Sequence, residues 1–395
     1  MRLAHVRQTS FPNAFTQVPQ SATSRCMTAA PLADPVLDTL LLPFATGDLA
    51  WPESGNILFL RARAGAALGK APRARLLCRQ SYLPFAQGLS AAGLTLDHAT
   101  PPASGSFPLI LVLPPRQRAE ARALLAEAVM AAEAGGIVVA ALANAEGAKS
   151  VEDDLAALAG GVESRSKNKC RVFWARIEPS RIDRARVASW QAGVSPREIA
   201  SAEFPGGKFW SRPGLFAWDR VDAGSALLAR HLPTDLAGHG ADLGCGTGYL
   251  GAVILSRRPG VTALDLYEAE QDALELAQRN LVPLAGGRRL AFYWHDVTRG
   301  LSHITGQQET GQQTDGRRDY DFIVSNPPFH VSRADRADLG QAFIGAAARA
   351  LKPGGRFLLV ANRHLPYEQG LVAGFAHFRV LAEEGGYKVI EAVAR

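Results

Sequence analysis

The sequence predicts an α/β protein with two tandem, doubly wound domains, of which the N-terminal one is degenerate. Strand-like and helix-like segments alternate through the C-terminal half, which is the βαβ pattern of a mostly parallel sheet. The N-terminal half repeats the same order of segments. The chain has 395 residues, 47% of them hydrophobic and 20% charged, so it can form two globular cores.

The C-terminal half carries the clearer pattern. Its predicted strands are 240–243, 261–267, 290–294, 320–325, 356–361, 378–381 and 387–393. Its predicted helices are 249–258, 269–281 and 339–351. Residues 302–318, between the third and fourth strands, are polar and aperiodic, which predicts a mobile surface insertion rather than a functional flap.

The N-terminal half has an apolar strand at 109–113, two prolines, an Ala-rich helix at 119–134, a Gly-Gly pair and a strand at 137–144. The C-terminal half repeats these features around its fourth strand. In this correspondence Leu113 replaces Asn326, and residues 59–65 replace 242–248 without the acid and the first two glycines. A duplication with a chemically silent N-terminal copy is therefore predicted, and chance similarity of two α/β domains is the alternative.

Domain boundaries follow from composition. Residues 1–33 contain no acid and no sustained apolar stretch, so we expect a disordered tail or an upstream start that precedes a true start at Met27, with an organelle transit peptide as the alternative. Residues 34–178 form the predicted degenerate domain and 179–209, with several prolines, the linker. Residues 210–395 form the predicted catalytic domain.

Charge and cysteine content limit the class of protein. The net charge of +6 and the pI near 9.3 suit a polyanionic partner or merely a basic surface. The four cysteines stand far apart, so no metal site is expected and a reducing cytoplasm fits. No apolar run approaches the ~20 residues that cross a bilayer.

A glycine-rich turn follows the first strand of the C-terminal half. Gly244, Gly246 and Gly248 let the backbone bend sharply and approach a ligand. Their spacing after Asp242 differs from the dinucleotide fingerprint, so a ligand without a pyrophosphate is expected. An acid beside the turn suits a cationic amino group, such as that of S-adenosyl-L-methionine.

A second acid should end the next strand and accept hydrogen bonds from a ribose diol. Glu268 is the preferred candidate because of its distance from the helix that follows, while Asp265 remains open. Asp296, after the third strand, would accept from an adenine amino group or simply cap a turn.

The tetrapeptide Asn326-Pro327-Pro328-Phe329 follows the fourth strand, at the sheet edge where such folds bind ligands. Proline lacks an N–H, so this segment presents carbonyl groups. The Asn326 side-chain oxygen and the Pro327 carbonyl can each accept a hydrogen from an amine, and Phe329 can stack on a planar acceptor. A turn with a core phenylalanine is the competing interpretation.

These motifs together resemble class I S-adenosylmethionine-dependent methyltransferases, with Asn326 to Phe329 similar to the motif of the amino-methylating branch. The segments 213–216 and 222–228 resemble the small-subunit ribosomal RNA guanine-N2 methyltransferase family. That resemblance implies two tandem Rossmann-like domains with seven-stranded sheets and helices on both faces. It also implies that Phe216, Asp222 and Gly224 line the donor pocket, together with Asn326.

The resemblance implies methylation of the N2 amine of a guanine in ribosomal RNA or the small ribosomal subunit. We expect a monomer in the cytoplasm. Two alternatives stay open, namely methylation of adenine N6 or of a protein glutamine amide, and a non-catalytic RNA-binding assembly factor. Six basic residues lie near the motifs in sequence and could contact phosphates as a set: Lys208, Arg212, Arg220, Arg333, Arg336 and Arg363.

Overall fold

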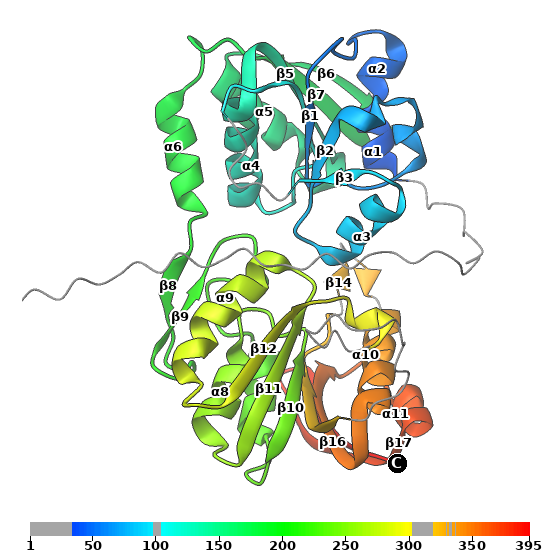
Figure 1. The fold of residues 1–395 in the computed structure, drawn as a ribbon, viewed down its shortest axis with the longest axis vertical. Helices are drawn as coiled ribbons and strands as arrows, with labels where there is room; N and C mark the ends of the chain where they lie inside the picture. The colour runs from blue at the N-terminus through cyan, green and yellow to red at the C-terminus, as the bar shows by residue number, and fades with distance from the viewer. Residues whose placement is uncertain (1–33, 98–103, 302–318, 329, 332–333, 336) are drawn as a thin grey trace, which may run out of the picture.

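The structure, a computed structural model, describes residues 34–97, 104–301, 319–328, 330–331, 334–335 and 337–395. The predicted tail 1–33 and insertion 302–318 lie outside these residues. Figure 1 shows two α/β domains, the N-terminal one drawn from blue to green above the C-terminal one drawn from green to red.

The N-terminal domain is a seven-stranded sheet with helices on both faces. Its strands are β1 (Ile57–Leu60), β2 (Leu76–Arg79), β3 (Thr95–Leu96), β4 (Phe107–Val112), β5 (Ala132–Ala143), β6 (Glu163–Lys167) and β7 (Cys170–Arg176). Its helices are α1 (Pro35–Leu40), α2 (Leu42–Thr46), α3 (Leu83–Ala91), α4 (Arg118–Ala131) and α5 (Ala148–Ala159).

The C-terminal domain has the same construction. Its strands are β10 (Gly238–Leu243), β11 (Val261–Glu268), β12 (Arg289–Trp294), β13 (Tyr320–Ser325), β16 (Leu351–Asn362), β17 (Phe375–Glu384) and β18 (Tyr387–Ala394). Its helices are α7 (Ala223–His231), α8 (Tyr249–Arg257), α9 (Gln271–Leu281), α10 (Ala337–Ala350) and α11 (Glu368–Gly374), and a small β14–β15 ribbon (His330–Val331, Ala334–Asp335) lies beside them.

Each sheet is buried on both faces, which explains why its central strands are continuous apolar runs. In β1, Leu58 and Leu60 pack into one core while Ile57 and Phe59 pack into the other. In the C-terminal domain, α7, α8 and α9 cover one face of the sheet, and α10 and α11 cover the opposite face. The two cores fix the strand ends from which the candidate site is built.

The two sheets share one topology. The strand orders are β3-β2-β1-β4-β5-β7-β6 and β12-β11-β10-β13-β16-β18-β17, which is the same order when each domain is numbered separately. All pairings are parallel except those of β7 and β18. The prediction of two tandem α/β domains is therefore confirmed.

The register identifies equivalent residues in the two domains. Leu60 pairs with Val112 at the ends of β1 and β4, and Leu243 pairs with Ser325 at the ends of β10 and β13. The next residues, Leu113 and Asn326, therefore occupy equivalent positions. Arg61 likewise occupies the position of Gly244, and its backbone is left-handed, with φ of 53°, as in the glycine.

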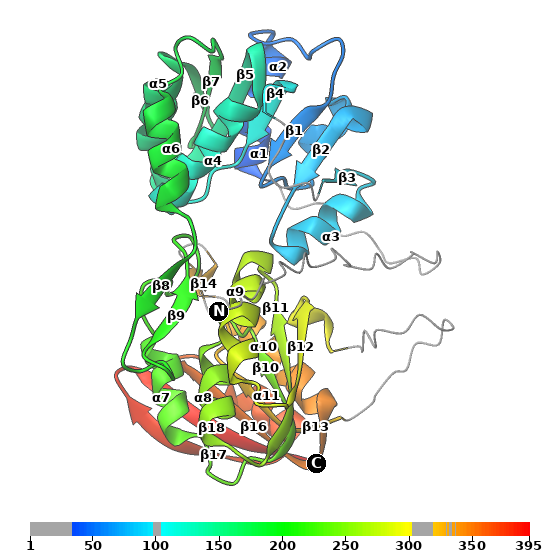
Figure 2. The ribbon, with the colours of Figure 1, turned by 60° about the vertical axis from the view of Figure 1, so that its left-hand side comes forward.

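The predicted linker contains regular structure. Helix α6 (Arg184–Gly193) buries Val187 against the N-terminal domain, and the hairpin β8–β9 (Arg197–Ala200, Lys208–Ser211) follows it. Figure 2 shows this hairpin reaching down beside the C-terminal domain. The prolines that predicted a linker fall outside α6 and the two strands, which is why they do not prevent these elements.

The described helices include none that is long and apolar enough to cross a membrane.

Candidate functional site

The candidate site lies at the carboxyl ends of the parallel strands β10, β11 and β13. Asp242 and Leu243 end β10, Glu268 ends β11, and Asn326 follows β13. An added Cβ at Gly244 would lie 4.0 Å from the main-chain oxygen of Asn326, so the glycine turn and the tetrapeptide lie side by side. The fold thus brings together motifs that are about eighty residues apart in sequence.

The glycine turn depends on its glycines. Gly244, Gly246 and Gly248 have φ values of 73°, 54° and 92°, in the region that favours glycine. Gly248 caps α8, so the turn delivers the chain directly to the N-terminus of that helix. The backbone N–H groups of Gly244 and Cys245 both donate to the main-chain carbonyl oxygen of Tyr267, and these bonds attach the turn to β11.

Asp242 is completely buried, and neither of its carboxylate oxygens accepts a well-formed hydrogen bond. Burial, and then the neighbouring Glu268 charge, raise the pKa of Asp242 to about 8, with only the Gly251 backbone N–H favouring ionisation. A buried carboxyl group without partners is costly unless a donor or a cation completes it. A cationic group at this acid would supply the missing partner.

Glu268 faces the glycine turn. One carboxylate oxygen accepts from the Gly246 N–H at 2.8 Å, and the other accepts from the N–H groups of Ala269 and Glu270 at 2.9 and 3.0 Å. Burial raises the pKa of Glu268, and these backbone donors partly offset that effect. The carboxylate is thus held in a fixed orientation beside the turn.

Asp265, the alternative to Glu268, lies inside β11 rather than at its end. It pairs with His239 and Arg289, both at 3.0 Å, and accepts from the Tyr320 hydroxyl at 2.8 Å. These partners lower the pKa of Asp265 despite its burial. Of the two acids, only Glu268 is placed at the glycine turn.

The amide of Asn326 has a defined direction. Its nitrogen donates to the Asp222 carboxylate at 2.9 Å and to the Ser225 hydroxyl at 2.8 Å. Because both amide hydrogens are engaged, the side-chain oxygen is left as the acceptor for a ligand. Asp222 is held in turn by the Ser225 backbone N–H at 2.8 Å, as the N-cap of α7.

Gly224 allows α7 to pack closely beside this amide network. A Cβ there would lie 3.0 Å from the Tyr387 ring and 3.1 Å from the Asp222 carboxylate.

Phe216, by contrast, is 68% exposed, so its side chain is free to contact a ligand. Pro327 is buried beside Asn326.

Two predicted residues need separate comment. Asp296 caps the short helix Val297–Arg299 by accepting from the Thr298 N–H and hydroxyl at 3.0 and 2.6 Å. The capping interpretation of this acid is therefore correct, and any contact with an adenine would be an additional role. Phe329 lies outside the residues that the structure describes, as do Arg333 and Arg336.

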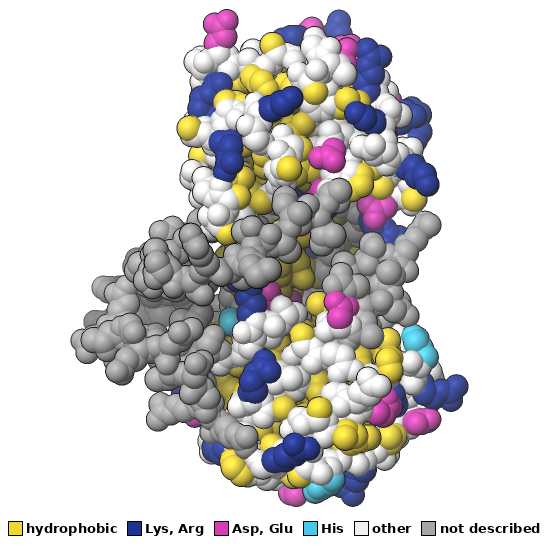
Figure 3. Space-filling view, turned by 90° about the vertical axis from the view of Figure 1, so that its right-hand side faces the viewer, with side chains coloured by type: hydrophobic (Ala, Val, Ile, Leu, Met, Phe, Trp, Pro, Cys, Tyr) yellow, Lys and Arg dark blue, Asp and Glu magenta, His cyan; other side chains and the backbone are white. Residues whose placement is uncertain are grey.

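Three of the other basic residues near the motifs are partly neutralised by acids. Lys208 pairs with Glu198, Arg212 with Asp272, and Arg220 with Asp219. Figure 3 shows Lys and Arg side chains spread over both domains on one face, interspersed with acids. These three side chains therefore do not form a free basic track.

Sequence reasoning assigned no role to Ser225 or Asn280. Ser225 could have been found from its position three residues after Asp222, because the side chain of an N-cap residue accepts a hydrogen bond from the backbone N–H at that position. Asn280, buried in α9, accepts from the Trp210 N–H at 2.7 Å and donates to the oxygens of Trp210 and Thr247 at 3.0 and 2.9 Å. It thereby joins β9 to the glycine turn.

Comparison with solved structures identifies a match over both domains. A 16S rRNA N2 G1207 methyltransferase (RsmC) from T. thermophilus, solved in complex with AdoMet and guanosine, is 26% identical and has a TM-score of 0.73. The match covers 92% of this chain and 93% of that one. The tandem arrangement is thus shared along the whole described fold.

Curated relatives match between about half and three quarters of the chain. The ribosomal RNA small subunit methyltransferase C of Shewanella baltica is 31% identical over 58% of this chain and 60% of its own length. The protein of the same name from another Shewanella species is 29% identical over 75% of this chain and 79% of its own length. In the first of these, the match spans only about three fifths of the relative.

A family model also matches the half that carries the site. The methyltransferase small domain family aligns with residues 206–391, which include the glycine turn and Asn326. Residues 206–391 are therefore similar to the methyltransferase small domain family, and the match covers just under half of the chain.

Proposed function

We propose that this protein is an S-adenosylmethionine-dependent methyltransferase that acts on the exocyclic N2 amine of a guanine in ribosomal RNA. The observation that carries the proposal is the fixed Asn326 amide beside the glycine turn. Its oxygen is left as the acceptor because Asp222 and Ser225 engage its nitrogen.

The residues at the turn fit the donor. Asp242 offers a buried carboxyl group without hydrogen-bond partners, which an ammonium group would complete. Glu268 is placed to accept from ribose hydroxyls, and Gly244 and Gly246 leave space for close backbone approach. Asp296, Phe216, Asp222 and Gly224 are the remaining proposed donor contacts. When bound, S-adenosylmethionine supplies an electrophilic methyl group on a positively charged sulfur.

Asn326 and Pro327 are proposed to orient the acceptor amine. The Asn326 side-chain oxygen and the Pro327 carbonyl each accept one hydrogen of the amine, which aims its lone pair at the methyl group. No strong base is required before attack, because a proton leaves the nitrogen after the new C–N bond forms. Phe329 is proposed to stack on the flipped-out base.

The substrate class is inferred from relatives. RsmC of T. thermophilus, which shares both domains, was solved with AdoMet and guanosine, and the Shewanella relatives are named for the small ribosomal subunit. We extend that substrate class to this chain. A monomeric state and a cytoplasmic location stay predictions.

Methyl transfer to defined acceptors tests the proposal. The protein is incubated with radiolabelled S-adenosylmethionine and small ribosomal subunits, total protein or DNA, and the labelled nucleoside is identified by mass spectrometry. N2-methylguanosine in ribosomal RNA is the expected product, absent with Asn326→Ala. Label confined to protein or DNA would contradict the substrate assignment. Absence of donor binding by calorimetry would instead favour a non-catalytic assembly factor.

A further inference from the structure

We infer that the silent N-terminal domain completes the donor site, because its segment 81–83 positions Glu268 through direct pairing with the catalytic domain. This inference rests on the proposed function, which assigns Glu268 to the donor. It gives the silent domain a specific task in donor binding that is separate from any contact with RNA.

The pairing joins two backbone segments. The Gln271 N–H donates to the Ser81 oxygen at 2.9 Å, and the Leu83 N–H donates to the Ala269 oxygen at 2.8 Å. Between these bonds, Tyr82 and Glu270 form an antiparallel bridge. Residues 269–271 of the catalytic domain therefore pair as a short antiparallel ladder with residues 81–83 of the silent domain. Helix α3, which begins at Leu83, is the part of the N-terminal domain nearest the C-terminal domain in Figure 2.

Trp294 strengthens this ladder from the catalytic side. Its indole N–H points at two carbonyl oxygens, Ser81 at 3.0 Å and Ala269 at 2.8 Å. Trp294 ends β12 in register with Glu268 on β11, so the indole lies next to the strand end that carries the acid. One side chain thus bridges the silent domain and the residue that follows Glu268.

The same short segment holds the Glu268 carboxylate. The N–H groups of Ala269 and Glu270 donate to one Glu268 oxygen at 2.9 and 3.0 Å. The other oxygen reaches the Gly246 N–H in the turn. Because residues 269 and 270 both pair with the silent domain and orient the carboxylate, displacement of the pairing would displace the acid.

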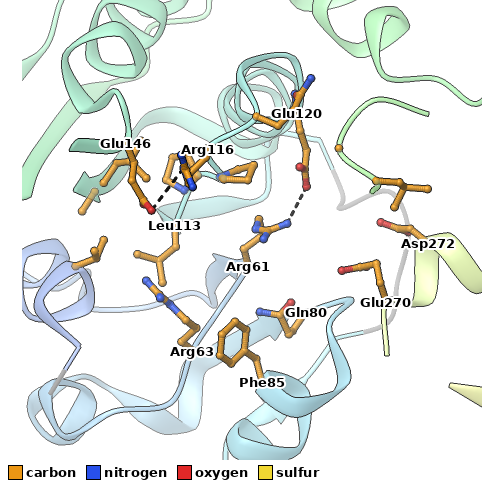
Figure 4. A pocket seen from close by; sticks show the side chains of 18 of the residues that line it. Arg61, Arg63, Gln80, Phe85, Leu113, Arg116, Glu120, Glu146, Glu270 and Asp272 are labelled. Atoms are coloured by element: carbon orange, nitrogen blue, oxygen red, sulfur yellow. Dashed lines mark hydrogen bonds and ion pairs between the residues drawn. The ribbon is translucent and has the colours of Figure 1, made fainter. Parts of the chain in front are cut away.

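The silent domain also contacts the segment around Gly214, which leads to the proposed donor contact Phe216. The Arg61 guanidinium forms an ion pair with the Glu120 carboxylate at 2.7 Å. The same carboxylate lies so close to Gly214 that a Cβ added there would be 2.7 Å from it. Gly214 is two residues before Phe216, a proposed donor contact. Figure 4 shows Arg61 and Glu120 pointing toward one another, with Glu270 and Asp272 facing them across a cavity of about 400 Å³.

A matched pair of substitutions at Leu83 isolates one interdomain hydrogen bond. Leu83→Pro and Leu83→Ala both remove the leucine side chain, but only proline removes the N–H that donates to Ala269. Leu83 is the first residue of α3, where proline is tolerated. Donor Kd is measured by calorimetry, and kcat is measured at saturating donor.

We expect Leu83→Pro to raise the donor Kd about three- to tenfold above that of Leu83→Ala, as loss of one hydrogen bond would. The kcat at saturating donor should be nearly equal in the two variants. Equal Kd values in two folded variants would overturn the inference. If the wild-type protein does not bind the donor, the proposed function itself fails.

If Leu83→Pro does not fold, two further measurements test whether the interdomain pairing supports donor binding. Trp294→Phe removes the bridging indole N–H and should weaken donor binding about three- to tenfold, whereas Trp190→Phe, on helix α6, should not. Because coupling is reciprocal, the donor should also slow hydrogen exchange at the Leu83 and Gln271 amides of the wild-type protein. Unchanged exchange at both amides with bound donor, or unaltered binding by Trp294→Phe, would contradict the inference.

Discussion

The amide of Asn326 can serve a ligand in only one way, because Asp222 and Ser225 occupy both of its hydrogens. An amide that rotated freely could present either a donor or an acceptor, and only the acceptor can orient an amine. The N-cap of α7 therefore sets the chemistry of a residue that lies 104 positions further along the chain.

Substitution of Asn326 should separate catalysis from donor binding. Asn326→Ala should lower kcat about 100- to 1000-fold, since it removes an oriented polar group at the reacting centre. Donor affinity should change little, because Asp242 and Glu268 remain. Ser225→Ala, which removes only one of two anchors, should have a smaller effect on kcat. Equal losses of turnover and donor binding in Asn326→Ala would assign the residue to the fold instead.

Asp242 should make donor binding dependent on pH. Its pKa is raised from the ordinary 3.8 to about 8, so the folded protein holds a proton there at neutral pH. Binding of an ammonium group favours the ionised form, so donor affinity should fall as the pH drops from about 8 to 6, by up to about tenfold per pH unit. Calorimetry in buffers of different ionisation enthalpy should detect the released proton. A flat profile would contradict this role.

The same pKa shift has a consequence for stability. As the pH rises above the ordinary value of 3.8, the unfolded chain ionises Asp242 before the folded protein does. The free energy of unfolding should therefore fall between about pH 4 and pH 8, and Asp242→Asn should show less of this fall in denaturant titrations. The Asn variant should also bind the donor weakly at every pH, which serves as the control for the binding profile.

At the scale of elements, the close packing of α7 against β18 is needed to place the Asn326 anchors. Gly224→Ala would put a methyl group 3.0 Å from the Tyr387 ring and 3.1 Å from the Asp222 carboxylate. The start of α7 must then shift, so kcat should fall while the thermal midpoint changes modestly. Ala223→Gly, at the neighbouring helical position, is the control. An active Gly224→Ala variant would show that α7 can move without disturbing Asn326.

Local sequence patterns predicted the elements well, because buried parallel strands and amphipathic helices leave strong periodic signals. They placed strand ends less well. β16 begins at Leu351 rather than near 356, because Leu351 already pairs with Tyr320 of β13. The pairing then shifts in register and resumes at Arg356, so Gly354 and Gly355, which patterns treat as a turn, lie inside the strand without a partner in this register. Glu268 does lie at the end of β11, and its distance from α9 is a local property that the sequence shows, while its role toward a ribose stays a prediction.

Contacts between distant segments were beyond such patterns. The Asn326 anchors and the bridge from Trp294 to Ser81, 213 residues apart, arise only when whole sheets are assembled. Nothing in the local sequence of α6 distinguished a docked helix from a linker, because its apolar contacts with the core are few: Val187 is buried and Trp190 is partly buried.

At the scale of the molecule, one fold is used twice with different chemistry. Leu113 occupies the place of Asn326 and is only 4% exposed within an apolar core. Leu113→Asn should destabilise the protein by about 1–3 kcal/mol, since a buried amide would lack partners. No methyl transfer should be gained. The converse change, Asn326→Leu, should abolish activity with a smaller effect on the denaturation midpoint, and the reverse ranking of the two midpoints would contradict the assignment.

The role of Asn280 has a consequence for how the chain can be divided. Asn280 joins Trp210 of β9 to Thr247 in the glycine turn, so the strand that enters the catalytic half is one of the supports of that turn. A fragment cut at Pro213 would lose this support, even though it would retain every residue that contacts the proposed ligands. Limited proteolysis should therefore yield a stable catalytic fragment only when cleavage falls before Arg197, with the hairpin retained.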